Sequence, residues 1–219
     1  MTPRSLTHDQ ARRVYDRIGS LQDTQAFYEA PAVRDLIRAG SFAGALAVFE
    51  LGCGTGRLAE RLLAGPLAAG ATYRGIDLSP KMVAIARRRL APFGPRAEVA
   101  LTDGGLPFPD ADGTYDRWIS AFVLDLLPDD EIDAVISEAH RMLRPGGLLC
   151  LASLSCGSGP VSRTIARLWR GIHRLHPAWV GGCRPLEIAA RLRPEDWHVE
   201  HHARFAPCGV PLEVVVAGV

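Results

Sequence analysis

The residues best suited to binding a ligand lie in a glycine-rich segment at the end of a short apolar run. The segment reads Glu50-Leu51-Gly52-Cys53-Gly54-Thr55-Gly56, with three glycines at alternate positions. Glycine lets the backbone approach a ligand closely, and Glu50 places a carboxylate beside that approach. The fingerprint of a dinucleotide site is GxGxxG, and Arg57 occupies the position of its third glycine. The segment therefore favours a nucleotide-like ligand without a pyrophosphate over a dinucleotide or a simple chain reversal.

Two further carboxylates follow apolar runs later in the chain. Asp77 stands in Gly75-Ile76-Asp77-Leu78-Ser79, and Asp103 stands in Leu101-Thr102-Asp103-Gly104-Gly105. A carboxylate placed like Asp77 can accept both hydroxyl protons of a ribose, and Asp103 can accept a hydrogen bond from the exocyclic amine of adenine. Each residue alone is also typical of a turn or a helix cap. Their order behind the glycine segment indicates one shared pocket.

Apolar runs of strand length alternate with amphipathic runs of helical length, and this pattern predicts βα units around a parallel sheet. The expected strands cover 47–51, 72–77, 98–103, 115–122 and 147–154. The expected helices between them cover 57–63, 80–90 and 130–143. Because the carboxyl ends of parallel strands meet at one edge of the sheet, the three carboxylates should lie together there.

The remaining segments predict a helical start and a paired end. Residues 7–39 have the pattern of one or two helices, and two late strands cover 197–205 and 212–219. Their short connection, 206–211, predicts an antiparallel hairpin. We therefore expect a single domain, 1–219. Its parts are an N-terminal helical lid at 1–44, a ligand-binding core at 45–155, a substrate-side insertion at 156–196 and the hairpin at 197–219.

The composition excludes several classes of protein. The chain has 219 residues with 25 Lys+Arg against 24 Asp+Glu, and this near-neutral balance does not favour nucleic acid binding. Its five cysteines are an odd number without a CxxC pair, so we expect reduced thiols and no metal site. No signal peptide is visible, and no apolar stretch reaches the about 20 residues that span a bilayer. We expect a cytoplasmic, metal-independent protein without a transmembrane segment.

On these residues the sequence resembles class I S-adenosylmethionine (SAM)-dependent methyltransferases, especially the small-molecule branch. That branch includes ubiquinone and menaquinone C-methyltransferases and phospholipid N-methyltransferases. The resemblance covers 48–154 and rests on the segments 50–56, 75–82, 103–108, 115–116 and 142–147. It implies an α/β, Rossmann-like seven-stranded sheet, mostly parallel with a C-terminal antiparallel hairpin and helices on both faces. It also implies SAM as the cofactor and S-adenosyl-L-homocysteine (SAH) as the product.

The resemblance implies roles for residues at the cofactor site. Asp77 would hold the ribose hydroxyls, Asp103 would lie by the adenine, and the glycine segment would pass the methionine portion. The cofactor-binding residues expected on this basis are Glu50, Gly52, Cys53, Gly54, Gly56, Asp77, Leu78, Met82, Asp103, Gly104 and Ala121.

Methyl transfer from a sulfonium is an in-line displacement, so alignment and exclusion of water can supply much of the catalysis. A general base is needed only where the acceptor must lose a proton. The sequence offers four candidates without singling one out: Asp125, Tyr15, Tyr28 and His176. The Asn-Pro-Pro-aromatic motif of many nucleic acid methyltransferases is missing after the fourth strand, which weighs against a nucleobase acceptor.

Residues 161–175 predict a strongly amphipathic helix. Arginines recur on one side of it, at Arg163, Arg167, Arg170 and Arg174. Apolar residues recur on the opposite side, at Val161, Ile165, Leu168, Ile172 and Leu175. We favour an ordinary surface helix with a solvated arginine side over a peripheral contact with an anionic membrane. The loop at 181–185 and the aromatic side chains of Phe27, Trp169 and Trp179 predict an apolar lid. Such a lid suits a small hydrophobic, aromatic or lipid-like acceptor, such as a quinone precursor or a phospholipid headgroup.

Two other functions stay open. A NAD(P)-dependent oxidoreductase is disfavoured by the glycine spacing and by the missing Tyr-x-x-x-Lys, since the only lysine is Lys81. A non-catalytic SAM-binding protein is compatible with the sequence, because methyltransferases of this fold have no obligatory catalytic residue. The sequence indicates no oligomeric state.

Overall fold

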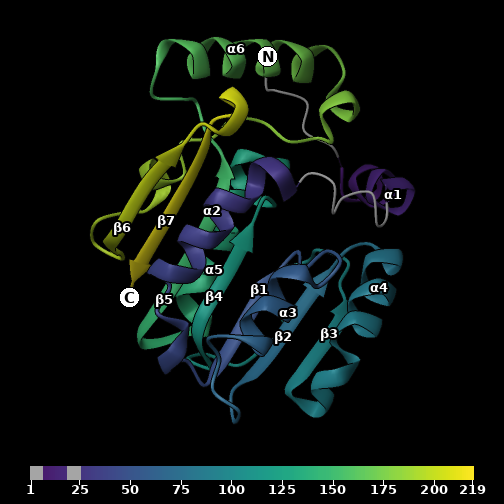
Figure 1. Ribbon diagram of the computed structural model, residues 1–219, viewed down its shortest axis with the longest axis vertical. Helices are drawn as coiled ribbons and strands as arrows, with labels where there is room; N and C mark the ends of the chain where they lie inside the picture. Colours follow the sequence, from purple (N-terminus) through teal and green to yellow (C-terminus); the bar gives the residue numbers. More distant parts are fainter. Residues whose placement is uncertain (1–6, 19–25) are drawn as a thin grey trace.

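A seven-stranded sheet forms the centre of the computed structural model, which describes residues 7–18 and 26–219 (Figure 1). The strands are β1 (Ala47–Leu51), β2 (Thr72–Asp77), β3 (Ala97–Leu101), β4 (Tyr115–Ala121), β5 (Leu143–Leu154), β6 (His198–Phe205) and β7 (Leu212–Gly218). Their spatial order is β3-β2-β1-β4-β5-β7-β6. Neighbours from β3 to β5 pair in parallel, whereas β7 runs antiparallel to both β5 and β6. The predicted Rossmann-like sheet with a terminal antiparallel hairpin is confirmed.

The strand order reverses at β1, which pairs with β2 on one side and β4 on the other. In an open parallel sheet, such a reversal leaves a crevice beyond the carboxyl ends of the strands. The register aligns Leu51 with Ile76 of β2 and with Ser120 of β4. The residues that follow these three positions therefore meet at one edge of the sheet.

Helices cover both faces of the sheet. They are α1 (His8–Ile18), α2 (Ala26–Ala39), α3 (Arg57–Ala64), α4 (Pro80–Leu90), α5 (Asp129–Met142) and α6 (Pro160–Leu175). Buried residues of α2, α3 and α4 form one apolar cluster with the sheet, while those of α5 and the segment 186–197 form the other. In Figure 1, α2 and α3 lie in front of the strands and α5 lies behind them. Two separate cores thus hold the strand ends in place.

Short 3₁₀ turns connect several of these elements. They are η2 (Phe42–Gly44), η3 (Ala91–Arg96), η4 (Leu124–Leu126), η5 (Pro177–Val180), η6 (Ala189–Arg191) and η7 (Pro207–Gly209). The helix starts follow the local sequence signals. Ser79 caps α4 by accepting a hydrogen bond from the Met82 backbone N–H at 3.1 Å, and Pro80 fills the first helical position.

Two strands differ from the sequence expectation by two or more residues at one end. The third strand ends at Leu101 rather than 103, because the Asp103 carboxylate turns back to accept the Gly105 N–H at 2.9 Å. The fifth strand begins at Leu143 rather than 147, and its pairing with β4 shifts register between Tyr115 and Arg117. Irregular pairing with β4 therefore accommodates the Pro-Gly-Gly segment that looked like a strand boundary.

The orientation of α6 differs from that of an ordinary surface helix. The side that faces the domain carries the buried residues Ser162, Ala166 and His173, whereas Val161 and Leu175 are 67% and 83% exposed. Small side chains allow the close approach, and the His173 ring contacts the Gly182 carbonyl at 3.1 Å. The packed side of α6 is therefore neither its apolar stripe nor its arginine side. Within residues 7–18 and 26–219, no helix has the length and apolar character needed to cross a membrane.

Candidate active site

A cavity of about 320 Å³ opens beyond the carboxyl ends of the central strands. Its walls come from α1, the loops after β1, β2, β3 and β4, and the start of α5. A smaller pocket of about 100 Å³ continues from it around the glycine segment, with Gly52, Gly54, Ala121 and Phe122 lining both. The larger cavity lies within the roughly 300–1,000 Å³ typical of small-molecule sites.

The glycine segment shapes the boundary between the two spaces. Gly54 has φ +52°, and a Cβ added there would meet nothing within 4 Å. A Cβ at Gly52, in contrast, would lie 2.2 Å from Val123 Cγ2. Gly56 begins α3 with φ +76°, and its bare Cα faces Ala86 of α4 rather than either pocket. The open side of Gly54 is therefore free for a ligand, while the other two glycines serve the conformation and packing of the loop.

Asp77 stands at the end of β2 on the wall of the larger cavity. Its carboxylate accepts the Gly54 N–H through Oδ2 and the Ser79 N–H through Oδ1, both at 2.9 Å. Burial raises the pKa of Asp77 above its usual range, against the two backbone donors that lower it. Each oxygen keeps a second acceptor site, since a carboxylate oxygen has two lone pairs. Asp77 thus holds the glycine segment and can also accept hydroxyl protons from a ligand.

Glu50 lines the smaller pocket and is 3% exposed. The Tyr73 hydroxyl donates a hydrogen bond of 2.5 Å to its Oε2 atom. Burial raises the pKa of Glu50 to about 7, although that hydrogen bond opposes the shift. A cationic group placed in this pocket would favour the ionised carboxylate. The pocket is therefore suited to a positively charged ligand group.

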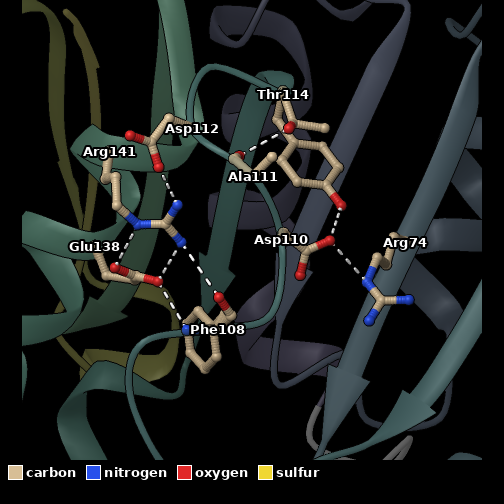
Figure 2. A network of polar contacts seen from close by, with 9 residues as sticks. Arg74, Phe108, Asp110, Ala111, Asp112, Thr114, Glu138 and Arg141 are labelled. Carbon is tan, nitrogen blue, oxygen red and sulfur yellow. Dashed lines mark hydrogen bonds and ion pairs between the residues drawn. The ribbon is translucent and has the colours of Figure 1, made fainter.

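A network of polar contacts fixes the loop between β3 and β4, which forms part of the cavity wall (Figure 2). The Phe108 N–H donates to Glu138 Oε1 at 2.8 Å, and Arg141 of α5 binds the same carboxylate at 2.6 Å. At the other end of the loop, Asp110 Oδ1 lies 3.1 Å from Arg74 Nε. These contacts anchor the loop to α5 at one end and to β2 at the other, and so hold Phe108 at the cavity wall.

Two residues of α1 complete the cavity, and no sequence pattern pointed to them. His8 and Arg12 line it, and His8 Nε2 lies 2.9 Å from Glu131 Oε2 at the start of α5. The same helix is attached to α4, where Ser79 Oγ donates to Asp16 Oδ1 at 2.5 Å. Because His8 and Glu131 are separated by 123 positions, no local pattern connects them.

The structure brings most of the expected cofactor residues together. The larger cavity is lined by Gly52, Gly54, Asp77, Leu78, Met82, Gly104 and Ala121. The smaller pocket adds Glu50 and Cys53. Gly56 and Asp103 line neither space; Asp103 instead faces a neighbouring hollow that also contacts His8 and Arg12.

The candidates for a general base lie away from the cavity lining. Asp125 is fully buried behind the wall, where its Oδ2 atom accepts the Leu154 N–H at 3.2 Å and burial raises its pKa to about 7. Tyr28 is half-buried, and burial raises its pKa well above the usual range. His176 is exposed and stacks on Trp179 with ring centroids 5.2 Å apart. The side chain of Tyr15 lies outside the described residues.

Of the expected apolar lid, only part packs against the domain. Phe27 and Trp179 are 69% and 75% exposed, whereas the half-buried Trp169 donates its indole N–H to the Cys183 carbonyl at 3.0 Å. Arg184 fixes the adjoining loop by donating to the Leu127 carbonyl at 2.8 Å. Since Leu127 lines the cavity, the insertion contacts the cavity wall directly.

Part of the chain is similar in sequence to known proteins. Residues 48–147 match the sequence model of a family described as a methyltransferase domain. A demethylmenaquinone methyltransferase of Tropheryma whipplei (strain Twist) is 37% identical over 108 residues, which cover 49% of this chain and 41% of the relative. The chain thus spans about two fifths of the length of this curated relative.

Solved structures agree on the fold over nearly the whole chain. The [4+2]-cyclase SpnF superposes with a TM-score of 0.74 at 17% identity, covering 99% of this chain and 97% of that one. The N-methyltransferase NodS from Bradyrhizobium japonicum WM9, solved with SAH, gives a TM-score of 0.71 at 18% identity and covers 95% and 97%. The matched segment, residues 48–147, is thus similar to a methyltransferase domain, and its fold is the one seen in the SAH-bound NodS structure.

Proposed function

We propose that this protein transfers a methyl group from SAM to a small hydrophobic acceptor. The observation that carries the proposal is the open side of Gly54, which joins the Asp77 wall of the larger cavity to the Glu50 wall of the smaller pocket. SAM matches these two connected spaces, because it has an adenosine at one end, a methionine at the other and a cationic sulfur between them.

The residues present fit this cofactor by their chemistry. The Asp77 carboxylate can accept the ribose hydroxyl protons, and the apolar contacts of Leu78 and Met82 suit a flat base. Glu50 offers a carboxylate for the methionine ammonium, and Arg57 and Arg61 line the same pocket near its carboxylate end. In this orientation the glycine segment passes between the two parts of the ligand. Asp103 lines neither space, so its contact with the adenine would require the loop around Gly104 to change conformation when SAM binds.

The bound cofactor supplies an electrophilic methyl group. This chain's residues hold the acceptor in line with that group and exclude water, which is where much of the rate enhancement of a positioned displacement arises. The described candidates Asp125, Tyr28 and His176 do not line the cavity, so we assign none of them as a general base. An acceptor whose proton is lost to solvent, or that carries a free lone pair, fits this site best.

The acceptor is proposed to be apolar because of the cavity wall. Leu106, Phe108, Val123, Leu126 and Val135 face the larger space. The insertion that carries Arg184 contacts the wall at η4 and can adjust its shape. A quinone precursor or other aromatic or lipid-like molecule matches this lining, and the curated relative named for demethylmenaquinone methylation supports that class.

Titration calorimetry with SAM, SAH and NADH tests the cofactor assignment. Binding of SAM and SAH without NADH is the expected result, and binding of NADH alone would replace it with the oxidoreductase alternative. An assay for SAH formation with phenolic quinone precursors and with phosphatidylethanolamine then tests the acceptor class. SAM binding without turnover of either class would leave a non-catalytic SAM-binding protein. SpnF, of the same fold, is named as a cyclase, so the fold alone does not imply methyl transfer.

We also propose where the protein acts and what it requires. We propose a cytoplasmic enzyme that needs no metal and acts on a small molecule rather than a nucleic acid. The described residues contain no group of three or more His, Cys, Asp or Glu side chains placed to hold a metal ion. An activity assay with and without a chelator tests the metal independence, and equal rates are expected.

A further inference from the structure

A second hollow lies between α6 and β6, outside the site described above. It measures about 380 Å³ and is lined by Cys156, Gly157, Arg163, Ala166, Arg167, Arg170, Glu187 and Arg204. None of these residues lines the larger cavity or the smaller pocket of the methyltransferase site. The hollow therefore belongs to the insertion and the hairpin rather than to the cofactor site. We name it the arginine hollow.

Positive charge dominates the arginine hollow, with four guanidinium groups against one carboxylate. Two of the four are already engaged: Arg204 pairs with Glu187, and Arg170 Nη2 donates to Cys156 Sγ at 3.0 Å. Arg163 and Arg167 have no ion pair or side-chain hydrogen bond with any residue in 7–18 or 26–219. Within one turn of α6, two arginines thus line a concave space without an ion pair of their own.

We propose that the arginine hollow binds the phosphate or diphosphate group of a ligand. Guanidinium groups form planar, bidentate hydrogen bonds that match phosphate oxygens, and several arginines around one concavity favour a multiply charged anion. Positions 163, 167 and 170 lie on one side of α6 because residues three and four apart are neighbours on a helix. Arg204 reaches the same space from β6, so the site has walls on two separate elements.

The arrangement of α6 favours a bound phosphate group over simple adhesion of the helix to a membrane. The exposed apolar residues Val161, Leu168 and Leu175 lie on the opposite side of the helix from the arginines. If that apolar side entered a bilayer, the arginine hollow would face away from the lipid phosphates. A phosphate in the hollow must instead come from a soluble molecule or from a single lipid headgroup that enters it.

Calorimetric titration of the full chain with inorganic pyrophosphate tests the proposal. Wild-type protein should bind it, and Arg163→Gln and Arg167→Gln should each weaken binding by about tenfold, the usual effect of losing a charged hydrogen-bonding partner. The matched control is Arg174→Gln, which removes the same charge from the same helix but does not line the hollow. The pyrophosphate affinity of this control should stay within twofold of wild type, because a residue outside the hollow should act independently of it.

Two further measurements separate this proposal from the methyltransferase function. SAH affinity should be the same in all four proteins, and saturating SAH should not displace pyrophosphate. Sedimentation with phosphatidylcholine vesicles, with and without phosphatidic acid, then identifies the source of the phosphate. Binding to the anionic vesicles that is lost in Arg163→Gln and Arg167→Gln but kept in Arg174→Gln supports a lipid headgroup. Pyrophosphate binding without vesicle binding supports a soluble ligand. No binding of pyrophosphate by wild-type protein at millimolar concentration, or an equal loss in Arg174→Gln, would overturn the proposal.

Discussion

At the scale of single residues, Asp77 combines two tasks in one carboxylate. It ties the glycine segment to β2 through the Gly54 N–H and keeps acceptor capacity toward the cavity. The acidic ends of β1 and β2 were predictable from the sequence, since a strand end followed by glycine is a local pattern. The position of Asp103 was not, because its side chain turns back on its own loop to reach Gly105.

Replacing Asp77 with asparagine should weaken SAM binding by roughly 1.5–3 kcal/mol, since a charge-assisted acceptor is lost. Asparagine keeps the shape and one acceptor oxygen, so the fold should persist. Calorimetric titration with SAM measures the change. Asp103→Asn is the matched control and should alter the affinity far less, because Asp103 does not line the cavity. Equal losses in the two variants would contradict the assignment of the ribose to Asp77.

Gly54→Ala places a methyl group in the space that we assign to the cofactor, and it should lower SAM affinity by at least about tenfold, a difference of about 1.4 kcal/mol. The variant also strains a backbone with φ +52°. Gly113→Ala provides the control, because that residue has a similar φ of +59° far from the cavity. Thermal unfolding should show similar destabilisation of both, whereas SAM titration should separate them. If both bind SAM like wild type, the glycine segment does not contact the cofactor.

At the scale of elements, the loop between β3 and β4 depends on α5 for its position. Glu138 is 7% exposed and holds the Phe108 backbone from one side, while Arg141 fixes Glu138 from the other. These two residues are three positions apart on α5, a spacing that the sequence shows plainly. Their partner lies thirty positions earlier in the chain, and nothing local indicated it. Long-range polar contacts of this kind are what sequence patterns omit.

Glu138→Ala should lower the unfolding free energy by about 1–3 kcal/mol, because it leaves the buried Phe108 N–H without its acceptor. It should also weaken SAM binding, since the loop forms part of the cavity wall. Denaturant unfolding and SAM titration measure the two effects. Asp112→Ala removes the exposed end of the same network, as Asp112 is 81% exposed, and should change stability little. A stability loss in Glu138→Ala without any change in SAM affinity would show that the loop position does not matter for binding.

Most helices and strands were predictable from the sequence, but the orientation of α6 was not. Strands, helix starts and the terminal hairpin follow from periodicity and capping residues, and Ser79-Pro80 placed the start of α4 correctly. The orientation of α6 did not follow, because a hydrophobic stripe normally turns inward. Here the small residues Ser162 and Ala166 and the His173 contact with Gly182 determine the packed side instead. Steric fit against a particular neighbour is information that one helix does not contain.

At the scale of the whole molecule, two buried carboxyls connect stability to pH. Burial raises the pKa of both Glu50 and Asp125 to about 7, from ordinary values of 4.5 and 3.8. Between those values the folded protein binds more protons than the unfolded chain. The free energy of unfolding should therefore fall as pH rises from about 4 to about 7 on their account, and level off above it.

The substitution Asp125→Asn should remove part of this decline in the free energy of unfolding. Denaturant unfolding at a series of pH values should give a shallower slope for Asp125→Asn than for wild type, with the difference confined to the window below about pH 7. Asp133→Asn is a surface control with 62% side-chain exposure and should keep the wild-type slope. Identical slopes for wild type and Asp125→Asn would show that this carboxyl does not keep its raised pKa in the folded state.

The place of β7 has a consequence for the order in which the chain can assemble. All seven residues of this strand are buried, and it lies between β5 and β6 although it follows both in the sequence. While a ribosome is still adding residues 155–211, β5 has no neighbour on that side and exposes an apolar edge. Such an edge attracts other unfinished chains. During synthesis, therefore, the protein should depend on chaperones until β7 enters the gap between β5 and β6.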